Sequence, residues 1–417
     1  MNRWKVKVSL FLNFLVLAIL LNSVGTVALQ VQRTYGVSAS AAGWLAAFKS
    51  LGIVTASFLA ISRLGQFGYR RTMLCALGGL TVVCLSLPSA SGFAVLELLF
   101  VAVGAGYALL KVSIYATVGL VTETPTEHAS FMSFLESFFT GGIVLGYFLF
   151  GAFVDDLHPR STDWLRAFYL IAAFSFVAWL LLLASPLDET AVEAGLRLPW
   201  REQWLGIFRL TVTRVVMLFA TCTFLYVMVE QSIMNWLPTY NRTVLRLPAS
   251  VSIQMASLFI IAMAAGRFLA GILLRRAAWF PVLVLCGAAA AAGLAVLDLL
   301  APGVASAPAA TGWQHAPAMA YLLPCVGFFV APIYPALNSV MLSALPVSRH
   351  GAMAGMSVLF SALGSSIGTV ALGFLFQDYG GQLAFYFPLL PIAALLISLA
   401  FFRKQAATAP GAAPDPS

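Results

Sequence analysis

The sequence predicts an all-α integral membrane protein whose twelve transmembrane helices form two six-helix halves. Of its 417 residues, 61% are hydrophobic and only 9% are charged, whereas an ordinary soluble protein carries about 25% charged residues. Apolar stretches long enough to cross a bilayer recur along the whole chain. The longest charged segment, 188–204, has six of these stretches before it and six after it.

The spans are separated by short polar connectors or by turn-forming residues. The twelve expected spans are 7–30, 40–62, 72–91, 93–120, 128–154, 165–186, 210–240, 249–274, 279–301, 316–345, 350–376 and 383–402. The domain boundaries that follow are an N-terminal six-helix bundle (1–187), a cytoplasmic linker (188–208), a C-terminal six-helix bundle (209–404) and a tail (405–417). The tail is rich in Ala and Pro, which predicts a disordered cytoplasmic segment.

The connectors define the spans of the first half. The basic start, 1–7, runs into the first span without a small-residue cleavage site, so we expect a retained helix rather than a signal peptide. Arg70 and Arg71 separate the second span from the third, and the polar segment 122–127 separates the fourth from the fifth. The sixth span ends at the charged linker.

Helix-breaking residues lie within two of the spans, where they permit bending and close helix packing. These helix-breaking residues are Pro324, Pro332 and Pro335 in the tenth span and Gly141, Gly142, Gly146 and Gly151 in the fifth.

In the second half, the segment 302–315, which is rich in small residues, joins the ninth span to the tenth.

Lys and Arg are concentrated in the connectors on the side of the N-terminus. By the positive-inside rule this places both termini in the cytoplasm, and we expect a multi-pass protein of the bacterial inner membrane. The net charge of +8 is scattered over short loops, which indicates topology and not a nucleic-acid-binding surface.

The expected partners are the lipid bilayer, a small-molecule substrate and a coupling proton. A monomer suffices, because one chain contains both halves.

Cysteines and histidines do not form a recognisable site. The five cysteines fall in apolar spans without paired spacing, and the four histidines lie near span ends. This pattern predicts neither disulfides nor a metal site. A Gly-rich phosphate loop ending in Lys and Ser or Thr is absent from the sequence, which argues against an ATP-driven pump. We therefore expect no cofactor and no enzymatic activity.

Four charged residues lie deep inside predicted spans, where an ionisable group is costly and indicates function. Lys49 and Glu230 fall near the middle of the second and seventh spans. Lys111 and Glu136 flank the same connector, each at a depth of roughly 12–14 Å, so they can pair as either a structural or a functional ion pair. A desolvated carboxylate can exchange protons, and a lysine can bind a carboxylate-bearing solute or neutralise an acid.

Glycines and arginines form two related motifs near the cytoplasmic ends of spans. The first is Gly65-Gln66-Phe67-Gly68-Tyr69-Arg70-Arg71, and the second is Gly266-Arg267 followed by Gly271, Arg275 and Arg276. Both resemble the loop motif of the major facilitator superfamily, although Gly65 stands where the acidic residue usually lies. The resemblance implies two six-helix halves with the substrate site near the midplane between them. It also implies gating roles, through charge and dipole contacts, for Arg70, Arg71, Arg267 and Arg275.

Three further segments resemble the fucose:proton symporter family, which includes hexose permeases. They are 224–240 in the seventh span, with Glu230 and Trp236-Leu237-Pro238-Thr239-Tyr240, 331–339 in the tenth span and 134–139 in the fifth. The resemblance implies proton-coupled sugar transport.

This chain departs from that family's pattern at its acidic positions. Gly25 and Leu109 stand where the family has acidic residues in the first and fourth helices. A glutamine commonly contacts sugar where this chain has Glu136. The proton would therefore have to be carried by Glu136 or Glu230.

Polar and aromatic side chains on the same spans are expected to line the solute pathway. Tyr stacks against sugar rings and donates hydrogen bonds, although such residues also serve as packing and interface anchors. The expected substrate-binding residues are Asn22, Tyr107, Tyr115, Tyr226, Gln231, Asn235, Tyr334 and Asn338.

These features predict a secondary active transporter that moves a small hydrophilic solute by alternating access. The solute is a sugar, or a sugar acid or other organic anion, and the coupling is proton symport, with sodium as the alternative ion. Glu136, Glu230, Lys49 and Lys111 are the expected proton-coupling or substrate charges. The alternative function is a proton-coupled exporter of amphipathic compounds or siderophore-like molecules. A membrane enzyme or a transport-incompetent sensor would belong to a different class, and neither a catalytic cluster nor a long soluble domain favours it.

Overall fold

A computed structural model describes residues 3–90, 92–121, 125–185, 213–274, 276–296, 312–343 and 350–406. Every regular element in these ranges is a helix. Nine of the described helices or helical runs are long and apolar enough to cross a membrane. The predicted class, an all-α membrane protein, is confirmed.

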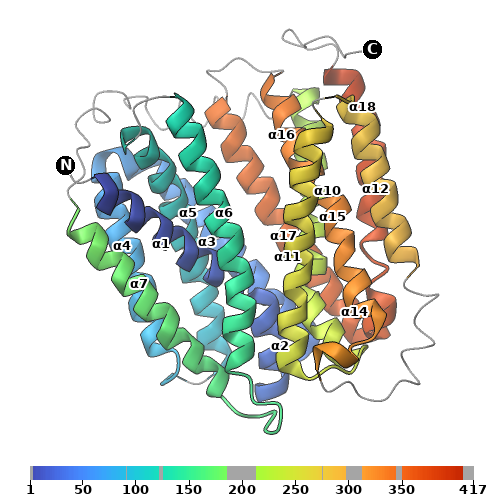
Figure 1. Cartoon of the computed structure of the whole chain (residues 1–417), viewed down its shortest axis with the longest axis horizontal. Coiled ribbons are helices and arrows are strands. Elements are labelled where there is room, and N and C mark those ends of the chain that lie inside the picture. The colour runs from blue at the N-terminus through green and yellow to red at the C-terminus, as the bar shows by residue number, and fades with distance from the viewer. Residues whose placement is uncertain are drawn as a thin grey trace. The chain divides into compact units, whose positions relative to one another are not determined.

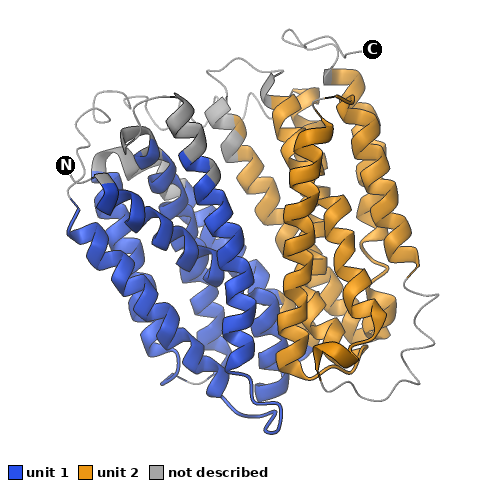
Figure 2. Cartoon of the chain, viewed as in Figure 1, with its two compact units in different colours: residues 1–38, 44–200 blue, residues 39–43, 201–417 orange. Residues whose placement is uncertain are grey.

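The chain divides into two compact units (Figure 2). Unit 1 comprises residues 1–38 and 44–200, and unit 2 comprises residues 39–43 and 201–417. The expected linker, 188–208, lies outside the described residues, as does the expected tail apart from 405 and 406. Both therefore stay predictions.

The helices of unit 1 follow the first six predicted spans (Figure 1). In chain order they are α1 (Arg3–Leu21), α2 (Val24–Tyr35), α3 (Ala39–Phe67, of which 39–43 cluster with unit 2), α4 (Tyr69–Ser86), α5 (Phe93–Val121), α6 (Pro125–Ala152), the 3-10 helix η1 (Asp163–Arg166) and α7 (Ala167–Leu183).

The first predicted span is two helices rather than one. The break falls at Asn22 and Ser23, between α1 and α2. The Ser23 hydroxyl donates to the Leu20 carbonyl at 2.8 Å, and Asn22 Nδ2 donates to the Ala18 carbonyl at 2.9 Å. Side chains that bond to nearby carbonyls in this way compete with the backbone ladder, which explains why the helix stops inside an apolar run.

Close helix contacts hold unit 1 together. Helix α4 packs against α5 and α7, and α1 packs against α5, α6 and α7. Helices α3 and α5 meet backbone to backbone, because a Cβ atom on Gly104 would overlap the Lys49 carbonyl oxygen and one on Gly52 would overlap that of Val101. Small residues at such crossings allow dense packing, which replaces the hydrophobic effect as the source of stability in lipid.

A hydrogen-bonded loop joins α6 to η1. Asp155 lies 2.7 Å from the His158 ring Nδ1 and accepts bonds from the backbone N–H groups of Leu157 and His158. The hydrogen bond with the His158 side chain, followed by the backbone bonds, lowers the pKa of Asp155. Arg33, on α2, donates to the Asp155 carbonyl at 3.3 Å and lies 3.8 Å from the Asp156 carboxylate, so it ties the end of α2 to this loop.

The helices of unit 2 follow the remaining six predicted spans. They are α10 (Arg214–Thr243), α11 (Ala249–Leu273), α12 (Trp279–Ala295), η2 (Trp313–His315), α14 (Ala318–Leu322), η3 (Leu323–Cys325), α15 (Val326–Val330), α16 (Ile333–Ser343), α17 (His350–Ala384) and α18 (Leu389–Ala406).

Proline and glycine interrupt two of these spans. The predicted tenth span is a run of short helices, α14, η3, α15 and α16, with Pro324 inside η3 and Pro332 between α15 and α16. Proline lacks the N–H that continues a helix, which explains these breaks. Helix α17 runs past its predicted end at 376 and is kinked at Gly380, whose φ of 78° is readily adopted by glycine.

Helix α10 is the centre of unit 2, because it packs against α11, α16, α17 and α18. Trp236, on α10, donates its indole N–H to the Thr369 carbonyl at 2.9 Å and stacks on Phe376, with ring centroids 5.1 Å apart. Tyr240, one turn later, packs against Phe385. These contacts fix the face of α10 that carries the polar residues described below.

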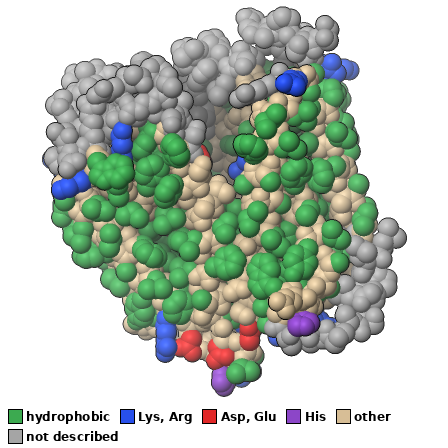
Figure 3. Space-filling model, in the orientation of Figure 1, with side chains coloured by type: hydrophobic (Ala, Val, Ile, Leu, Met, Phe, Trp, Pro, Cys, Tyr) green, Lys and Arg blue, Asp and Glu red, His purple; other side chains and the backbone are tan. Residues whose placement is uncertain are grey.

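The outer surface of both units is largely apolar. Figure 3 shows hydrophobic side chains over most of the described surface in that view. Leu98 in unit 1 and Phe268, Leu285 and Leu390 in unit 2 are 70–73% exposed. Large apolar side chains with this exposure suit contact with lipid.

Candidate functional site

A carboxylate, a guanidinium and a phenol meet where α10 packs against α11 in unit 2. The Glu230 Oε1 atom accepts a hydrogen bond from the Tyr226 hydroxyl at 2.9 Å and forms an ion pair with Arg267 Nη2 at 3.2 Å. The Glu230 side chain is 13% exposed and that of Arg267 is 43% exposed. We call these three residues the unit 2 cluster.

Helix geometry sets up this cluster. Tyr226 and Glu230 are four residues apart on α10, so both lie on one face of that helix. Arg267 lies on α11, which packs against α10. The residue before it, Gly266, allows α11 to approach α15 closely, since a Cβ atom there would overlap the Phe328 carbonyl.

Two of the expected substrate-binding residues lie behind Tyr226. The Tyr334 ring stacks on the buried Tyr226 ring, with centroids 5.5 Å apart and an interplanar angle of 20°. The Tyr334 hydroxyl is 2.9 Å from Ser357 Oγ on α17. Asn338 Nδ2 donates to the Tyr334 carbonyl at 2.9 Å, so its amide supports α16 locally.

Unit 1 contains a second cluster of the same chemical groups. Lys111 Nζ donates to the Tyr107 hydroxyl at 2.9 Å and lies 5.3 Å and 5.6 Å from the ring centroids of Tyr107 and Tyr115. The Tyr115 hydroxyl donates to the Glu136 carboxylate. We call Tyr107, Lys111, Tyr115 and Glu136 the unit 1 cluster.

The structure corrects the expected pairing of Lys111 with Glu136. Among the described residues, the ammonium contacts the two tyrosines, and Tyr115 connects it to the carboxylate in place of a direct ion pair. Phe14, on α1, packs against both Tyr115 and Phe139, with centroid distances of 6.0 Å and 5.5 Å, and so holds the α5 and α6 side chains in position.

Lys49 contacts the end of α1. It is only 4% exposed, and its Nζ donates to the carbonyl of Leu21, the last residue of α1, at 3.4 Å. A cation at a helix C-terminus is favourable because that end carries partial negative charge. The same break contains Asn22, whose amide also bonds to α1. Both residues therefore serve the interrupted first helix.

Two amides of α10 face α17. Asn235 is 1% exposed, and its Nδ2 donates to Thr369 Oγ1 at 2.9 Å. Asn235 therefore belongs to the interface between α10 and α17, and its expected role in substrate binding stays a prediction. Gln231 Oε1 accepts a bond from Ser365 at 3.5 Å and remains partly exposed.

The expected gating arginines have different surroundings. Arg70 donates to the carbonyls of Leu183 and Ser185, at 2.8 Å and 3.0 Å, and so caps the end of α7. Arg71 is exposed, and Arg275 lies outside the described residues. Arg267 pairs with Glu230 rather than with a helix end, and its expected gating role stays a prediction.

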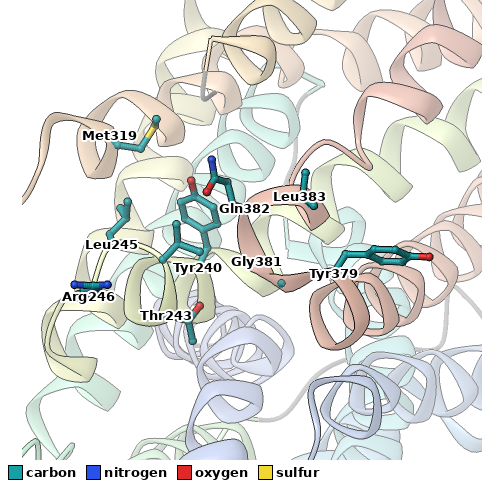
Figure 4. A pocket seen from close by; sticks show the side chains of 11 residues that line it. Tyr240, Thr243, Leu245, Arg246, Met319, Tyr379, Gly381, Gln382 and Leu383 are labelled. Atoms are coloured by element: carbon teal, nitrogen blue, oxygen red, sulfur yellow. The ribbon is translucent and has the colours of Figure 1, made fainter. Parts of the chain in front are cut away.

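Unit 2 also contains a cavity of about 370 Å³ that sequence reasoning missed (Figure 4). Its walls come from the end of α10, the following turn, α14 and the kink of α17. Arg246 lines it with a left-handed backbone (φ 57°), which is uncommon for a residue other than glycine. Gly380 and Gly381 form part of another wall, next to Gln382. The signal for this cavity is a backbone conformation, which no side-chain pattern reveals.

Both clusters offer the same chemistry. Each presents a carboxylate that accepts a tyrosine hydrogen bond, and a basic side chain contacts that carboxylate or that tyrosine. Protonation of the carboxylate changes the net charge of its cluster by one. The binding of a proton to each cluster is therefore coupled electrostatically to the binding of a charged solute.

The fold is shared with solved transporter structures. A D-xylose-proton symporter matches with a TM-score of 0.73 and 13% identity over 95% of this chain and 97% of that one. The Escherichia coli fucose:proton symporter FucP matches with a TM-score of 0.60 and 16% identity, over 96% of this chain and 99% of that one. A bacterial homologue of the human lysosomal transporter Spinster matches with a TM-score of 0.74 and 14% identity, over 100% and 99%.

The sequence comparison identifies the family. No curated protein gives a significant sequence match. The family profile of the Major Facilitator Superfamily matches residues 8–369, which is most of the chain. The chain therefore belongs to the Major Facilitator Superfamily, and it is a membrane transporter and not an enzyme.

Proposed function

We propose that this transporter is a proton-coupled symporter that takes up a small hydrophilic solute, either a sugar or a sugar acid or other organic anion, by alternating access. Glu230 and Glu136 are the carboxylates that bind the proton or the solute. Lys49 and Lys111 are the expected counter-charges, and Arg267 supplies a further one to Glu230. The observation that carries this proposal is the unit 2 cluster, in which a poorly exposed carboxylate has one hydroxyl donor and one cation.

The physical argument concerns charge in a medium of low dielectric constant. An ionised carboxylate inside a span is costly unless it is paired, and protonation offers a second way to remove that cost. Glu230 is paired with Arg267 when ionised. A second ligand of Arg267, or a conformational change that separates the two, would favour proton uptake. The affinity of Glu230 for a proton therefore depends on whether solute is bound and on the conformation of the transporter.

Similar structures support the choice of solute class. Those titled as a D-xylose-proton symporter and a fucose:proton symporter transport sugars with protons, and another is titled as a nucleoside transporter. At 13–16% identity, these likenesses show the fold alone. The assignment of coupling to this chain therefore rests on its own charged residues. We place the protein in the bacterial inner membrane with both termini in the cytoplasm, as the distribution of Lys and Arg favours. We propose a monomer, because one chain contains both halves.

Proton flux in proteoliposomes tests the proposal. Purified protein is reconstituted with a pH-sensitive dye inside, and neutral sugars, sugar acids and small carboxylates are added outside. We expect at least one solute to acidify the lumen in the wild type. Glu230→Gln removes the titratable group, so we expect it to lose solute-driven proton movement while it keeps solute counterflow, which needs no net proton transfer.

Matched controls define the outcomes. Glu97→Gln neutralises another carboxylate of an apolar helix, α5, away from both clusters, and should behave as wild type. Undiminished proton movement in both Glu230→Gln and Glu136→Gln would contradict the proposal. Proton movement elicited by amphipathic compounds, and by none of the hydrophilic solutes, would establish the exporter instead.

A further inference from the structure

The two charged members of the unit 2 cluster differ in access. The Arg267 side chain is 43% exposed, whereas that of Glu230 is 13% exposed. Tyr226, which donates to Glu230, is buried at 1% exposure beneath the Tyr334 ring. A solute that reaches this cluster therefore meets the guanidinium rather than the carboxylate. Guanidinium is also the side chain whose geometry suits a planar carboxylate.

We propose that the solute carries a carboxylate, and that this carboxylate takes the place of Glu230 on Arg267 when Glu230 becomes protonated. The proposal rests on the proposed proton symport and names its substrate class. In the exchange, one proton binds the Glu230 carboxylate, the ion pair with Arg267 at 3.2 Å is broken, and the solute carboxylate forms a new ion pair with the same guanidinium.

Charge balance makes the exchange an all-or-none event. With neither ligand bound, Glu230 and Arg267 sum to zero. A proton alone gives this pair a net charge of +1, and an anion alone gives the pair and its ligand a net charge of −1. Both together restore zero. Because an uncompensated charge in a low-dielectric site is costly, the empty and the doubly loaded states are favoured over either singly loaded one.

The groups around Glu230 fit this scheme. Among the described residues, the groups that contact Glu230 include Tyr226 on its own helix and Arg267 on α11, with Tyr334 of α16 stacked behind Tyr226. The Tyr226 hydroxyl can donate to the carbonyl oxygen of a protonated Glu230 as it does to the carboxylate. Glu230 therefore keeps the Tyr226 hydrogen bond when Arg267 is taken by the solute.

The exchange has a consequence that separates it from neutral sugar symport. One proton and one monovalent carboxylate enter together, so each cycle moves no net charge. Uptake should follow an imposed pH gradient and ignore a membrane potential set with potassium and valinomycin. A neutral sugar entering with one proton would move one positive charge and would respond to the potential.

Binding to matched pairs of molecules is the first test. Thermal stabilisation of the purified protein is measured with gluconate, glycerate and lactate, and with the corresponding neutral amides. We expect stabilisation by at least one carboxylate and not by its amide. Arg267→Gln should weaken that binding by about tenfold or more, because it removes one partner of an ion pair. Arg166→Gln, at the exposed end of the 3-10 helix η1, is the matched arginine control.

Glu230→Gln provides a readout that a merely structural role would not change. It resembles the protonated carboxyl and leaves Arg267 without its internal competitor. We expect it to bind the carboxylate at least as tightly as wild type, and with an affinity that no longer falls as pH rises. Should Arg267→Gln fail to fold, this variant and Arg267→Lys keep the test intact.

The outcomes are distinguishable from those of the symport test. Stabilisation by no carboxylate, equal stabilisation by the amides, or loss of binding in Glu230→Gln each overturns the carboxylate exchange. Proton-coupled uptake of a neutral sugar that responds to membrane potential would overturn the exchange and leave proton symport standing. Potential-independent carboxylate uptake that ignores pH would refute both.

Discussion

Asn235 lies in a helix interface, where its Nδ2 donates to Thr369 Oγ1 at 2.9 Å. We predict that Asn235→Ala and Thr369→Ala each lower the free energy of unfolding by about 1 kcal/mol. The double variant should cost less than the sum, since one bond is shared, with a coupling of about 0.6 kcal/mol. Unfolding measured in detergent–lipid mixtures checks this. Neither variant should change which solutes are transported, and a changed solute preference would return Asn235 to the pathway.

Single residues show how far depth along a span predicts contacts. Counting along helices from the shared connector brought Lys111 and Glu136 into the same cluster, but it could not show that Tyr115 contacts both. The same counting leaves Glu230 and Arg267 at depths of roughly 20 Å and 27 Å from their connector. The long arginine side chain spans this difference in depth. Counting residues along the helices therefore did not predict the pair.

Helix crossings depend on glycine where two backbones touch. We predict that Gly104→Ala reduces the yield and the melting temperature of the folded protein, because the added Cβ would overlap the Lys49 carbonyl and push α3 away from α5. Gly79→Ala on α4 is the matched control, since a Cβ there meets no atom within 4 Å. Thermal unfolding monitored by fluorescence size-exclusion chromatography compares the two. Equal melting temperatures would show that the α3–α5 crossing tolerates separation.

Hydropathy predicted where helices lie better than where they stop. All twelve expected spans are helical over most of their described residues, but the first is divided at Asn22 and Ser23 and the eleventh continues past its expected end to a kink at Gly380. These features depend on hydrogen bonds between side chains and carbonyls and on one backbone angle. An average over apolar side chains contains neither kind of information.

The topology of the whole molecule can be tested with two exposed arginines. In a variant without its five native cysteines, we predict that Arg246→Cys reacts with a membrane-impermeant maleimide added outside intact cells. Arg71→Cys should react only after the membrane is opened, because the excess of Lys and Arg places its connector in the cytoplasm. Both side chains are exposed, so access of the reagent is comparable. The reverse labelling pattern would invert the orientation.

At the scale of the molecule, composition and the polar central segment were sufficient to predict an all-helical membrane transporter. The superfamily motifs strengthened that prediction, and the match over residues 8–369 establishes it. The solute could not be predicted in the same way, because it depends on which atoms of a few side chains face open space. Arg267 is more exposed than Glu230, and this difference arises only when unit 2 folds, so the sequence alone does not reveal it.

The interrupted first helix has one more consequence. Carbonyl oxygens at the end of a half-helix are a common binding place for a transported sodium ion. Here the Lys49 ammonium donates to the Leu21 carbonyl at such an end. A positive charge that is covalently attached to α3 neutralises these oxygens, yet it cannot dissociate and cross the membrane. The break in the first helix thus holds a tethered cation at the Leu21 carbonyl, and we expect a transported sodium ion to bind elsewhere.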